Sequence, residues 1–181
     1  MLELRRIDHS AGIAEREAFL EALRRALPER HVLLSTCDRV ELYADMPGCN
    51  DAVTLHKGAG HLFRVAAGLE SPLLGETQIL HQVKESYHIA AEQGAASPLL
   101  HRLFQSAMRA GKRVRAETDI CRGAVSHAQG ALEIIHERYP DLNQRRIALI
   151  GVNNLNRTIL SYLRRRSSAM VFLGNRTHAR A

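Results

Sequence analysis

Aromatic side chains are scarce in this chain. It has no tryptophan, and its four phenylalanines and four tyrosines make up only 4% of its 181 residues. Proteins that bind single-stranded nucleic acid through its bases stack those bases on exposed aromatic side chains. We therefore expect no base-stacking platform, and any contact with RNA should be directed at its phosphates and its shape.

Cysteine is also rare, with three residues at wide spacing, Cys37, Cys49 and Cys121. An odd number at such spacing does not form a disulfide framework, which favours a reducing compartment. We therefore expect a cytoplasmic protein. The cysteines and the scattered histidines also lack the spacing of metal ligands, so no metal site is expected.

Long apolar runs are missing as well. The longest are too short to cross a bilayer, and the first residues contain no apolar core of a signal peptide, so we expect no membrane association. Positive charge is in excess, because 25 Lys and Arg face 19 Asp and Glu, a net charge of +6. Such a charge suits a polyanionic partner. Arg102, Arg109 and Arg113 share one face of a predicted helix, either as a solvated face or as a phosphate-binding stripe.

The hydrophobic pattern predicts an α+β unit followed by a helical second half. Strands are expected at residues 1–9, 31–36 and 40–44, with a helix at 13–27. Residues 46–60 read as a loop with a short helix from Asp51. Further helices are predicted at 61–68, 78–93, 98–117 and 125–138.

The last forty residues predict a second domain. Residues 146–151 and 169–173 read as strands around a helix at 155–166, the β-α-β start of a Rossmann-type nucleotide-binding fold. We expect domains at 1–139 and 140–181, with Pro140 in the linker. One β-α-β unit cannot cover both faces of its strands, so we expect either that the chain is cut at Ala181 or that it is a decayed remnant.

The first turn of this segment departs from the G-x-G-x-x-G dinucleotide template. Gly151 keeps the tight turn, but Asn153 and Asn156 replace the glycines that admit a pyrophosphate and let helix and strand pack closely. After the second strand come Asn175, Arg176 and Thr177. An arginine there can accommodate the 2′-phosphate of NADPH, although a surface arginine after a strand reads equally well.

The most informative stretch is the polar turn around Cys37, between two strand-like runs. A fixed cation such as Arg39 near a thiol favours the thiolate, and a turn on a rigid frame leaves a nucleophile accessible. The alternative is a small buried cysteine with Arg39 in a surface ion pair.

Residues 35–43 read S-T-C-D-R-V-E-L-Y and resemble the S-T-C-N-R-x-E-x-Y signature of glutamyl-tRNA reductases. The similarity continues in family order through residues 61–71, 74–80, 82–84, 111–118 and 175–177. It covers most of the chain, and the joint specificity of these motifs is high.

The resemblance implies an N-terminal catalytic domain, a long spinal helix, an NADPH-binding domain and a C-terminal dimerisation region. It implies NADPH-dependent reduction of glutamyl-tRNA to glutamate-1-semialdehyde, which feeds 5-aminolevulinate and tetrapyrrole synthesis. The implied partners are glutamyl-tRNA, a second copy in a homodimer and the downstream aminomutase.

The same resemblance assigns residue roles. Cys37 would attack the aminoacyl ester to give a thioester that hydride from NADPH reduces, and His61 would assist proton transfer. The cofactor would be held by Gly151, Asn153, Asn175, Arg176 and Thr177. The glutamyl group would be held by Thr36, Arg39, Ser71, Glu76 and Gln78.

Two departures from the family pattern bear on function. Asp38 stands where the signature has asparagine, and its negative charge should raise the pKa of Cys37. The segment from Cys37 to His61 is also shorter than in typical members. Without a complete NADPH domain we expect the chain to form the glutamyl-enzyme at most. The alternatives are a non-catalytic module that binds tRNA or a partner, and a haem-binding regulator.

Overall fold

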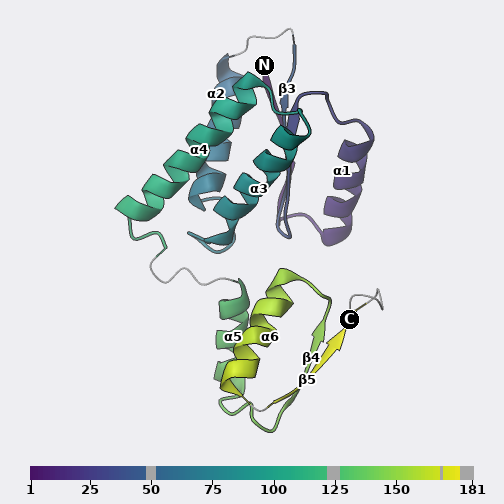
Figure 1. The fold of residues 1–181 in the computed structure, drawn as a ribbon, viewed down its shortest axis with the longest axis vertical. Coiled ribbons are helices and arrows are strands. Elements are labelled where there is room, and N and C mark those ends of the chain that lie inside the picture. The colour runs from purple at the N-terminus through teal and green to yellow at the C-terminus, as the bar shows by residue number, and fades with distance from the viewer. Residues whose placement is uncertain (48–51, 122–126, 168, 176–181) are drawn as a thin grey trace. The chain divides into compact units, whose positions relative to one another are not determined.

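We describe the protein from a computed structural model, in which residues 1–47, 52–121, 127–167 and 169–175 are described. These residues form a mixed α/β structure with six helices and five strands. The chain divides into two compact units, Met1–Ala124 and Val125–Ala181 (Figure 1). Each unit is described by itself.

The first unit is built on a three-stranded antiparallel sheet. It consists of β1 (Leu2–Ile7), β2 (His31–Ser35) and β3 (Val40–Asp45), with β3 in the middle. The three predicted strands are thereby confirmed. Successive side chains of a strand point to opposite faces of its sheet, and both faces are covered here (Figure 1).

One face of the sheet packs against α1 (Ile13–Arg25). Leu23 of this helix joins Val40 and Leu42 of β3 in a small buried cluster, with Leu20 against its edge. The helix ends at Arg25, slightly earlier than predicted, and Ala26 leaves the helical conformation and donates its backbone N–H to the carbonyl of Leu23.

The other face is covered by α2 (Ala52–Ala67), α3 (Gln78–Glu92) and α4 (Pro98–Glu117) (Figure 1). The main core lies between them and the sheet, where the rings of Tyr43 and Phe104 meet edge to face at 5.3 Å. The predicted start of α4 is confirmed, because Ser97 caps the helix by accepting a hydrogen bond from Leu100 N at 3.3 Å.

The short helix predicted from Asp51 and the helix predicted at residues 61–68 are one continuous helix, α2, which begins at Ala52, so the prediction that a loop continues to residue 60 is wrong. Its glycines indicated a break, but Gly58 serves close packing. A Cβ on Gly58 would lie 2.9 Å from Cδ2 of Leu2, so the absent side chain lets α2 approach β1. The expected loop residues 48–51 lie outside the described residues.

The second unit contains α5 (His127–Arg138), β4 (Arg146–Ile150), α6 (Asn154–Arg166) and β5 (Met170–Gly174). The two strands pair in parallel around α6. Leu132 of α5 packs in one buried cluster with Leu163 of α6 and Leu149 of β4. For this reason α5 belongs to the second unit, and the units divide earlier than the predicted boundary at residues 139 and 140.

Within the described ranges, no helix is both long and apolar enough to span a bilayer.

Candidate active site

Cys37 lies in the turn that joins β2 to β3, and its side chain is exposed. Thr36 holds this turn in shape. Its backbone N donates to the carbonyl of Arg39 at 2.9 Å, and its Oγ1 accepts from the backbone N of Asp38 and of Arg39, each at 3.2 Å. The Thr36 hydroxyl therefore fixes the backbone on both sides of an exposed thiol.

A buried charge cluster extends from this turn along β3. Arg39 is 2% exposed and Glu41 is 0% exposed. Nη1 of Arg39 donates to Oε1 of Glu41 at 3.1 Å, and the hydroxyl of Tyr43 donates to Oε2 of Glu41 at 2.6 Å. The three residues alternate along the strand, so their side chains share the face that α2 covers. A buried carboxylate persists only with such partners.

His61 of α2 completes this cluster. It is 3% exposed, and its Nε2 lies 2.8 Å from Oε1 of Glu41. Its Nδ1 lies 4.0 Å from Oε1 of Glu70. Burial acts to raise the pKa of Glu41, but hydrogen bonds from His61 and Tyr43 and the charge of Arg39 outweigh it and lower that pKa. Glu41 is therefore ionised, and its carboxylate links β3 to α2.

The pKa of the Cys37 thiol is shifted in the opposite direction, because its surroundings disfavour the charged form. Removal of water by the surrounding protein raises its pKa, and the negative charges of Asp38 and Glu76 raise it further. The expected effect of Asp38 is confirmed. The expected stabilisation of a thiolate by Arg39 is wrong, because that guanidinium turns away to Glu41 and to the carbonyl of Glu70.

The loop between α2 and α3 is closed by two glycines in the left-handed conformation. Gly68 has φ +83° and Gly75 has φ +76°, and the backbone N of Gly75 donates to the carbonyl of Gly68 at 3.0 Å. A Cβ on Gly75 would lie 2.0 Å from the carbonyl oxygen of Ile120, so only glycine fits there.

Arg115 of α4 ties this loop to the end of α2. It donates to the carbonyl of Ala66 at 2.6 Å and to that of Glu76 at 3.1 Å. Two predicted substrate-binding residues lie in this loop, and a third directly follows it. Ser71 is half-buried, Glu76 is buried, and Gln78 is exposed at the first position of α3.

The structure therefore brings most of the predicted catalytic and substrate-binding residues to one end of the sheet. Arg39 reaches the carbonyl of Glu70, next to Ser71, and the charge of Glu76 acts on Cys37. Three segments distant in sequence meet there: the β2–β3 turn, α2 and the loop that precedes α3.

The predicted cofactor residues lie in the second unit. Gly151 has φ +96°, and its backbone N donates to the carbonyl of Gly174 at 2.7 Å. Oδ1 of Asn153 accepts from the backbone N of Asn156 at 2.8 Å and caps α6. Nδ2 of Asn156 donates at 2.8 Å to the carbonyls of Ile150 and of Gly151.

The two asparagine side chains thus occupy the turn in which the dinucleotide template keeps only glycine backbone. Asn153 already satisfies an amide at the start of α6 that would otherwise face a phosphate. The described turn does not fit a pyrophosphate in this conformation. Asn175 is half-buried after β5, and Arg176 and Thr177 lie outside the described residues.

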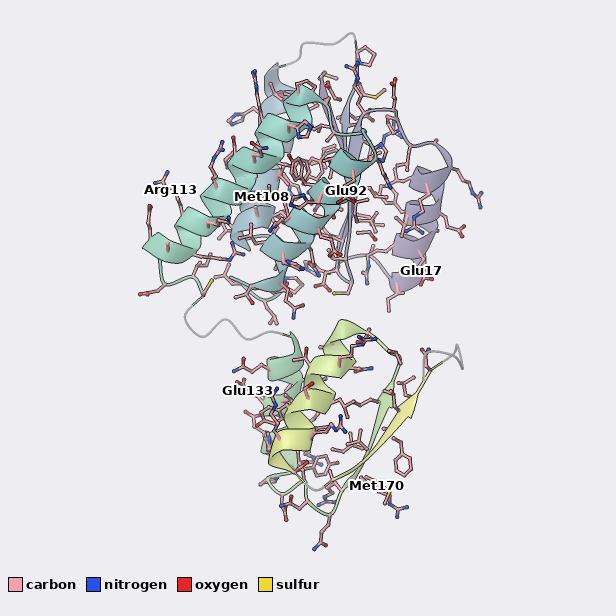
Figure 2. All side chains as sticks on the ribbon, in the orientation of Figure 1. Glu17, Glu92, Met108, Arg113, Glu133 and Met170 are labelled. Atoms are coloured by element: carbon pink, nitrogen blue, oxygen red, sulfur yellow. The ribbon has the colours of Figure 1, made fainter. Side chains whose placement is uncertain are left out.

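A groove of about 470 Å³ runs between α3 and α4. Its basic lining residues are Lys84, Arg109, Lys112 and Arg115, with His81 beside them. Only Arg109 of the predicted arginine stripe lines this groove. Arg113 lies on the side of α4 away from α3 and donates to Glu117 at 3.1 Å, whereas Met108 lies on the groove side (Figure 2).

The sequence model of the family described as "Glutamyl-tRNAGlu reductase, N-terminal domain" matches residues 6–118. The chain belongs to this family. Glutamyl-tRNA reductase of Microcystis aeruginosa is 38% identical over 174 residues, covering 82% of this chain and 41% of that protein. Glutamyl-tRNA reductase of Aquifex aeolicus is 35% identical over 195 residues, covering 95% of this chain and 48% of that protein.

A solved structure is similar over nearly the whole chain. Glutamyl-tRNA reductase from Methanopyrus kandleri superposes with a TM-score of 0.60 at 33% identity, covering 99% of this chain and 50% of that one. The chain thus spans half or less of the length of these glutamyl-tRNA reductases.

Three residues of the site in this family member were missed by the sequence analysis: Glu41, Glu70 and Arg115. The signal for Glu41 was present, since it is the one acid in an otherwise uncharged V-E-L-Y-A stretch of a strand. A charge flanked by apolar strand residues marks either a solvent-facing position or a buried partner. Glu70 and Arg115 gave no local signal, because their contacts are with residues far away in the sequence. The carbonyl of Glu70 accepts from Arg39, and Arg115 donates to the carbonyl of Glu76.

Proposed function

We propose that this chain binds glutamyl-tRNA and transfers the glutamyl group to Cys37, the thioester-forming step of a glutamyl-tRNA reductase. The observation that supports this most directly is an exposed thiol on a rigid turn, bordered by the buried cluster of Glu41, Arg39 and His61. The similar proteins are glutamyl-tRNA reductases, and this name supplies the substrate class and the reaction.

In the proposed step the sulfur of Cys37 attacks the ester carbonyl of glutamyl-tRNA. A sulfur–carbon bond forms, the ester carbon–oxygen bond breaks, and the terminal ribose leaves as its hydroxyl. The thiol must lose its proton, and its raised pKa means that a base has to take it. The negative charges of Asp38 and Glu76 act on this thiol and oppose its ionisation, so we expect the step to become faster as the pH rises.

Arg39 has a positioning role in this conformation. Nη1 and Nη2 are both engaged, and Nε is buried without a hydrogen-bond partner among the described residues. A bidentate grip on the glutamyl carboxylate therefore requires release of the contact with Glu41 or Glu70. Gln78 is exposed and Ser71 is half-buried, and both side chains can donate hydrogen bonds to the glutamyl group.

His61 is proposed to act from within the cluster. Its Nε2 is held by Glu41, which fixes the orientation of the ring and leaves Nδ1 on the side of Glu70. A ring held in this way can pass a proton at one defined nitrogen.

For the second unit we propose the start of a Rossmann-type domain, supported by the parallel pairing of β4 and β5 around α6. NADPH would supply the hydride that reduces the thioester. Because Asn153 and Asn156 fill the described turn, we derive no step through the cofactor. The homodimer, the aminomutase partner and the cytoplasmic location stay predictions.

The proposal is tested by incubating the chain with glutamyl-tRNA and measuring its intact mass. We expect a covalent adduct of one glutamyl group, lost in Cys37→Ser and retained in Cys121→Ser, a matched control at another free cysteine. An adduct that persists in Cys37→Ser contradicts the assignment of the nucleophile.

A second candidate is a non-catalytic tRNA-binding module, which the raised pKa of Cys37 favours. It predicts tight, salt-dependent binding of tRNA without any adduct at pH values where the thiol ionises. The same mass measurement, combined with a binding isotherm, distinguishes the two candidates.

A further inference from the structure

The net positive charge of the chain belongs to its second unit. Residues 125–181 contain nine arginines against three acids, a net charge of +6, whereas residues 1–124 contain sixteen cations and sixteen anions. The unit that carries Cys37 is therefore neutral overall. Attraction of a polyanion by net charge comes from the second unit.

Five of these arginines lie at one end of the second unit. The strands of a β-α-β unit begin at the edge of the sheet where its helix ends. Arg146 is the first residue of β4, and Arg164 and Arg165 lie in the last turn of α6. The backbone N of Met170, which begins β5, donates to the carbonyl of Arg145 at 3.1 Å. Together with a residue of α5 they form the basic end, which consists of Arg138, Arg145, Arg146, Arg164 and Arg165.

The last turns of α5 and α6 meet at this end. The hydroxyl of Tyr162 on α6 lies 3.2 Å from Nε2 of His136 on α5, and both residues line a small pocket of about 70 Å³ with Leu142. Figure 1 shows the C-terminal ends of both helices on the side where the arrows of β4 and β5 begin. Arg138, the last residue of α5, therefore belongs to the same surface.

The five side chains are exposed and have no acidic partner. Every ion pair among the described residues lies in the first unit. The acids nearest in sequence are Glu137 and Asp141, which are also exposed, and Asp141 accepts from the backbone N of Asn143. The guanidinium of Arg145 lies over the ring of Tyr139, 5.1 Å from its centroid.

Stabilisation of the helices does not account for the whole cluster. Arginines in a last turn complement the negative end of the helix dipole, which suits Arg164 and Arg165. Arg145 and Arg146 lie before β4 and at its first position, where no helix dipole acts on their own segment. Like charges gathered without counter-ions repel one another, and a bound polyanion relieves this repulsion.

The kind of cation indicates the kind of anion. All nine cations of the second unit are arginines, whereas the three lysines, at positions 57, 84 and 112, lie in the first unit. A planar guanidinium binds a phosphate through two parallel hydrogen bonds, which an ammonium group cannot do. A lipid surface suits this end less, because the apolar sides of α5 and α6 are buried against β4 and neither helix can insert one.

We propose that the basic end binds the phosphate backbone of a folded RNA. Because aromatic side chains are scarce, the contact follows the phosphates and the A-form shape rather than the bases. The basic end lies at the start of β4, and Gly151 and Asn153 follow the opposite end of this strand. Binding of RNA therefore leaves the predicted cofactor turn uncovered. The inference rests on the charges of the second unit and does not require the thioester step.

The first test uses the full chain and a labelled RNA hairpin that carries no amino acid, with binding followed by fluorescence anisotropy at several salt concentrations. Arg164→Gln/Arg165→Gln is compared with Arg24→Gln/Arg25→Gln, which changes two adjacent exposed arginines in the last turn of α1. Only the first variant should lower the magnitude of the slope of log K against log salt, by about two. Equal slopes in the two variants, or no binding by the parent at about 50 mM salt, overturn the inference.

The second test leaves the helix ends unchanged. Arg146→Gln is compared with Arg5→Gln, since both residues are exposed arginines on a strand and Arg5 belongs to the first unit. Arg146→Gln should lower the magnitude of the same slope by about one, and Arg5→Gln should leave it as in the parent. A slope for Arg146→Gln equal to that of the parent overturns a site that extends beyond the helix ends.

The third test decides between RNA and a lipid surface. Binding of the parent to phosphatidylcholine vesicles that contain phosphatidylserine is measured at the salt concentration at which the hairpin is half bound. We expect less binding to the vesicles than to the hairpin, at equal total negative charge. Equal or tighter binding to the vesicles overturns RNA as the partner. Because the hairpin carries no glutamyl group, a failure here leaves the proposed transfer to Cys37 standing, and the absence of an adduct at Cys37 leaves this inference standing.

Discussion

Nε2 of His61 lies 2.8 Å from Oε1 of Glu41, and both side chains are buried. This contact joins α2 to the central strand of the sheet across 20 positions of sequence. Because the same carboxylate also accepts from Arg39 and Tyr43, the geometry around Cys37 depends on one ionised group.

Replacement of Glu41 by glutamine should destabilise the first unit strongly. The substitution removes the buried negative charge and leaves Arg39 without its counter-ion, a loss of about 3 kcal/mol in the free energy of unfolding. Urea denaturation followed by circular dichroism measures it. Glu21→Gln is the control, since that exposed residue pairs with Arg25 on the surface, and its effect should be about 0.5 kcal/mol or less. A loss below about 1 kcal/mol in Glu41→Gln contradicts the role of the cluster.

The stability of the parent should fall in acid partly through Glu41. Its pKa in the folded chain is lowered from the ordinary 4.5, so its contribution is present above the unfolded pKa and is lost as the pH falls through the folded pKa. The difference in unfolding free energy between the parent and Glu41→Gln should therefore be largest near neutral pH and shrink below pH 4.5. Urea titrations of both proteins across this range measure it. A difference that grows on acidification would show that the carboxyl is protonated in the folded chain.

Asp38→Asn should make Cys37 more reactive. Asp38 contributes a negative charge that raises the pKa of the thiol, so its removal favours the thiolate and shifts the alkylation rate profile to lower pH. The rate of iodoacetamide modification of Cys37 as a function of pH provides the measurement. Asp141→Asn, a change of the same kind in the second unit, should leave the profile in place. An unchanged profile in Asp38→Asn would mean that Asp38 does not act on this thiol.

Gly75→Ala and Gly94→Ala form a matched pair. Both glycines have a positive φ, +76° and +71°, so alanine carries a similar conformational cost of about 1 kcal/mol at each. Only at Gly75 would the new Cβ collide with a carbonyl oxygen, whereas Gly94 has open space. Thermal unfolding should therefore show Gly75→Ala to be the more destabilised by at least about 2 kcal/mol. Equal losses of unfolding free energy in the two variants would mean that Gly75 does not lie against the carbonyl of Ile120.

The groove between α3 and α4 is tested by the salt dependence of tRNA binding. Arg109 lines the groove, while Arg113, one turn later on α4, lies outside it and pairs with Glu117. If the groove contacts phosphates, Arg109→Gln should reduce the magnitude of the slope of log K against log salt by about one, the value expected for one lost phosphate contact. Arg113→Gln should change this slope little. Filter binding at several salt concentrations provides the slope. Equal changes in the two variants contradict a groove-specific contact.

The sequence alone determined the features that arise from local interactions. Strand alternation located β2 and β3, and Ser97 with Pro98 marked the start of α4, because caps and periodicity act over three or four residues. The polar turn at Cys37 could be recognised for the same reason, as could the charge effect of its neighbour Asp38.

Tertiary structure decided what depends on contacts across the chain. The sequence predicts a loop around Gly58, where the structure has a helix packed closely against β1, and it places α5 in the first domain, although the apolar face of α5 packs against α6. Arg39 reads as a partner of the thiol, yet it pairs with Glu41 and with the carbonyl of Glu70, 31 positions away. Local sequence cannot reveal which charge a buried group will pair with. That choice is made when α2 and the loop before α3 close over the sheet and exclude water from the charges.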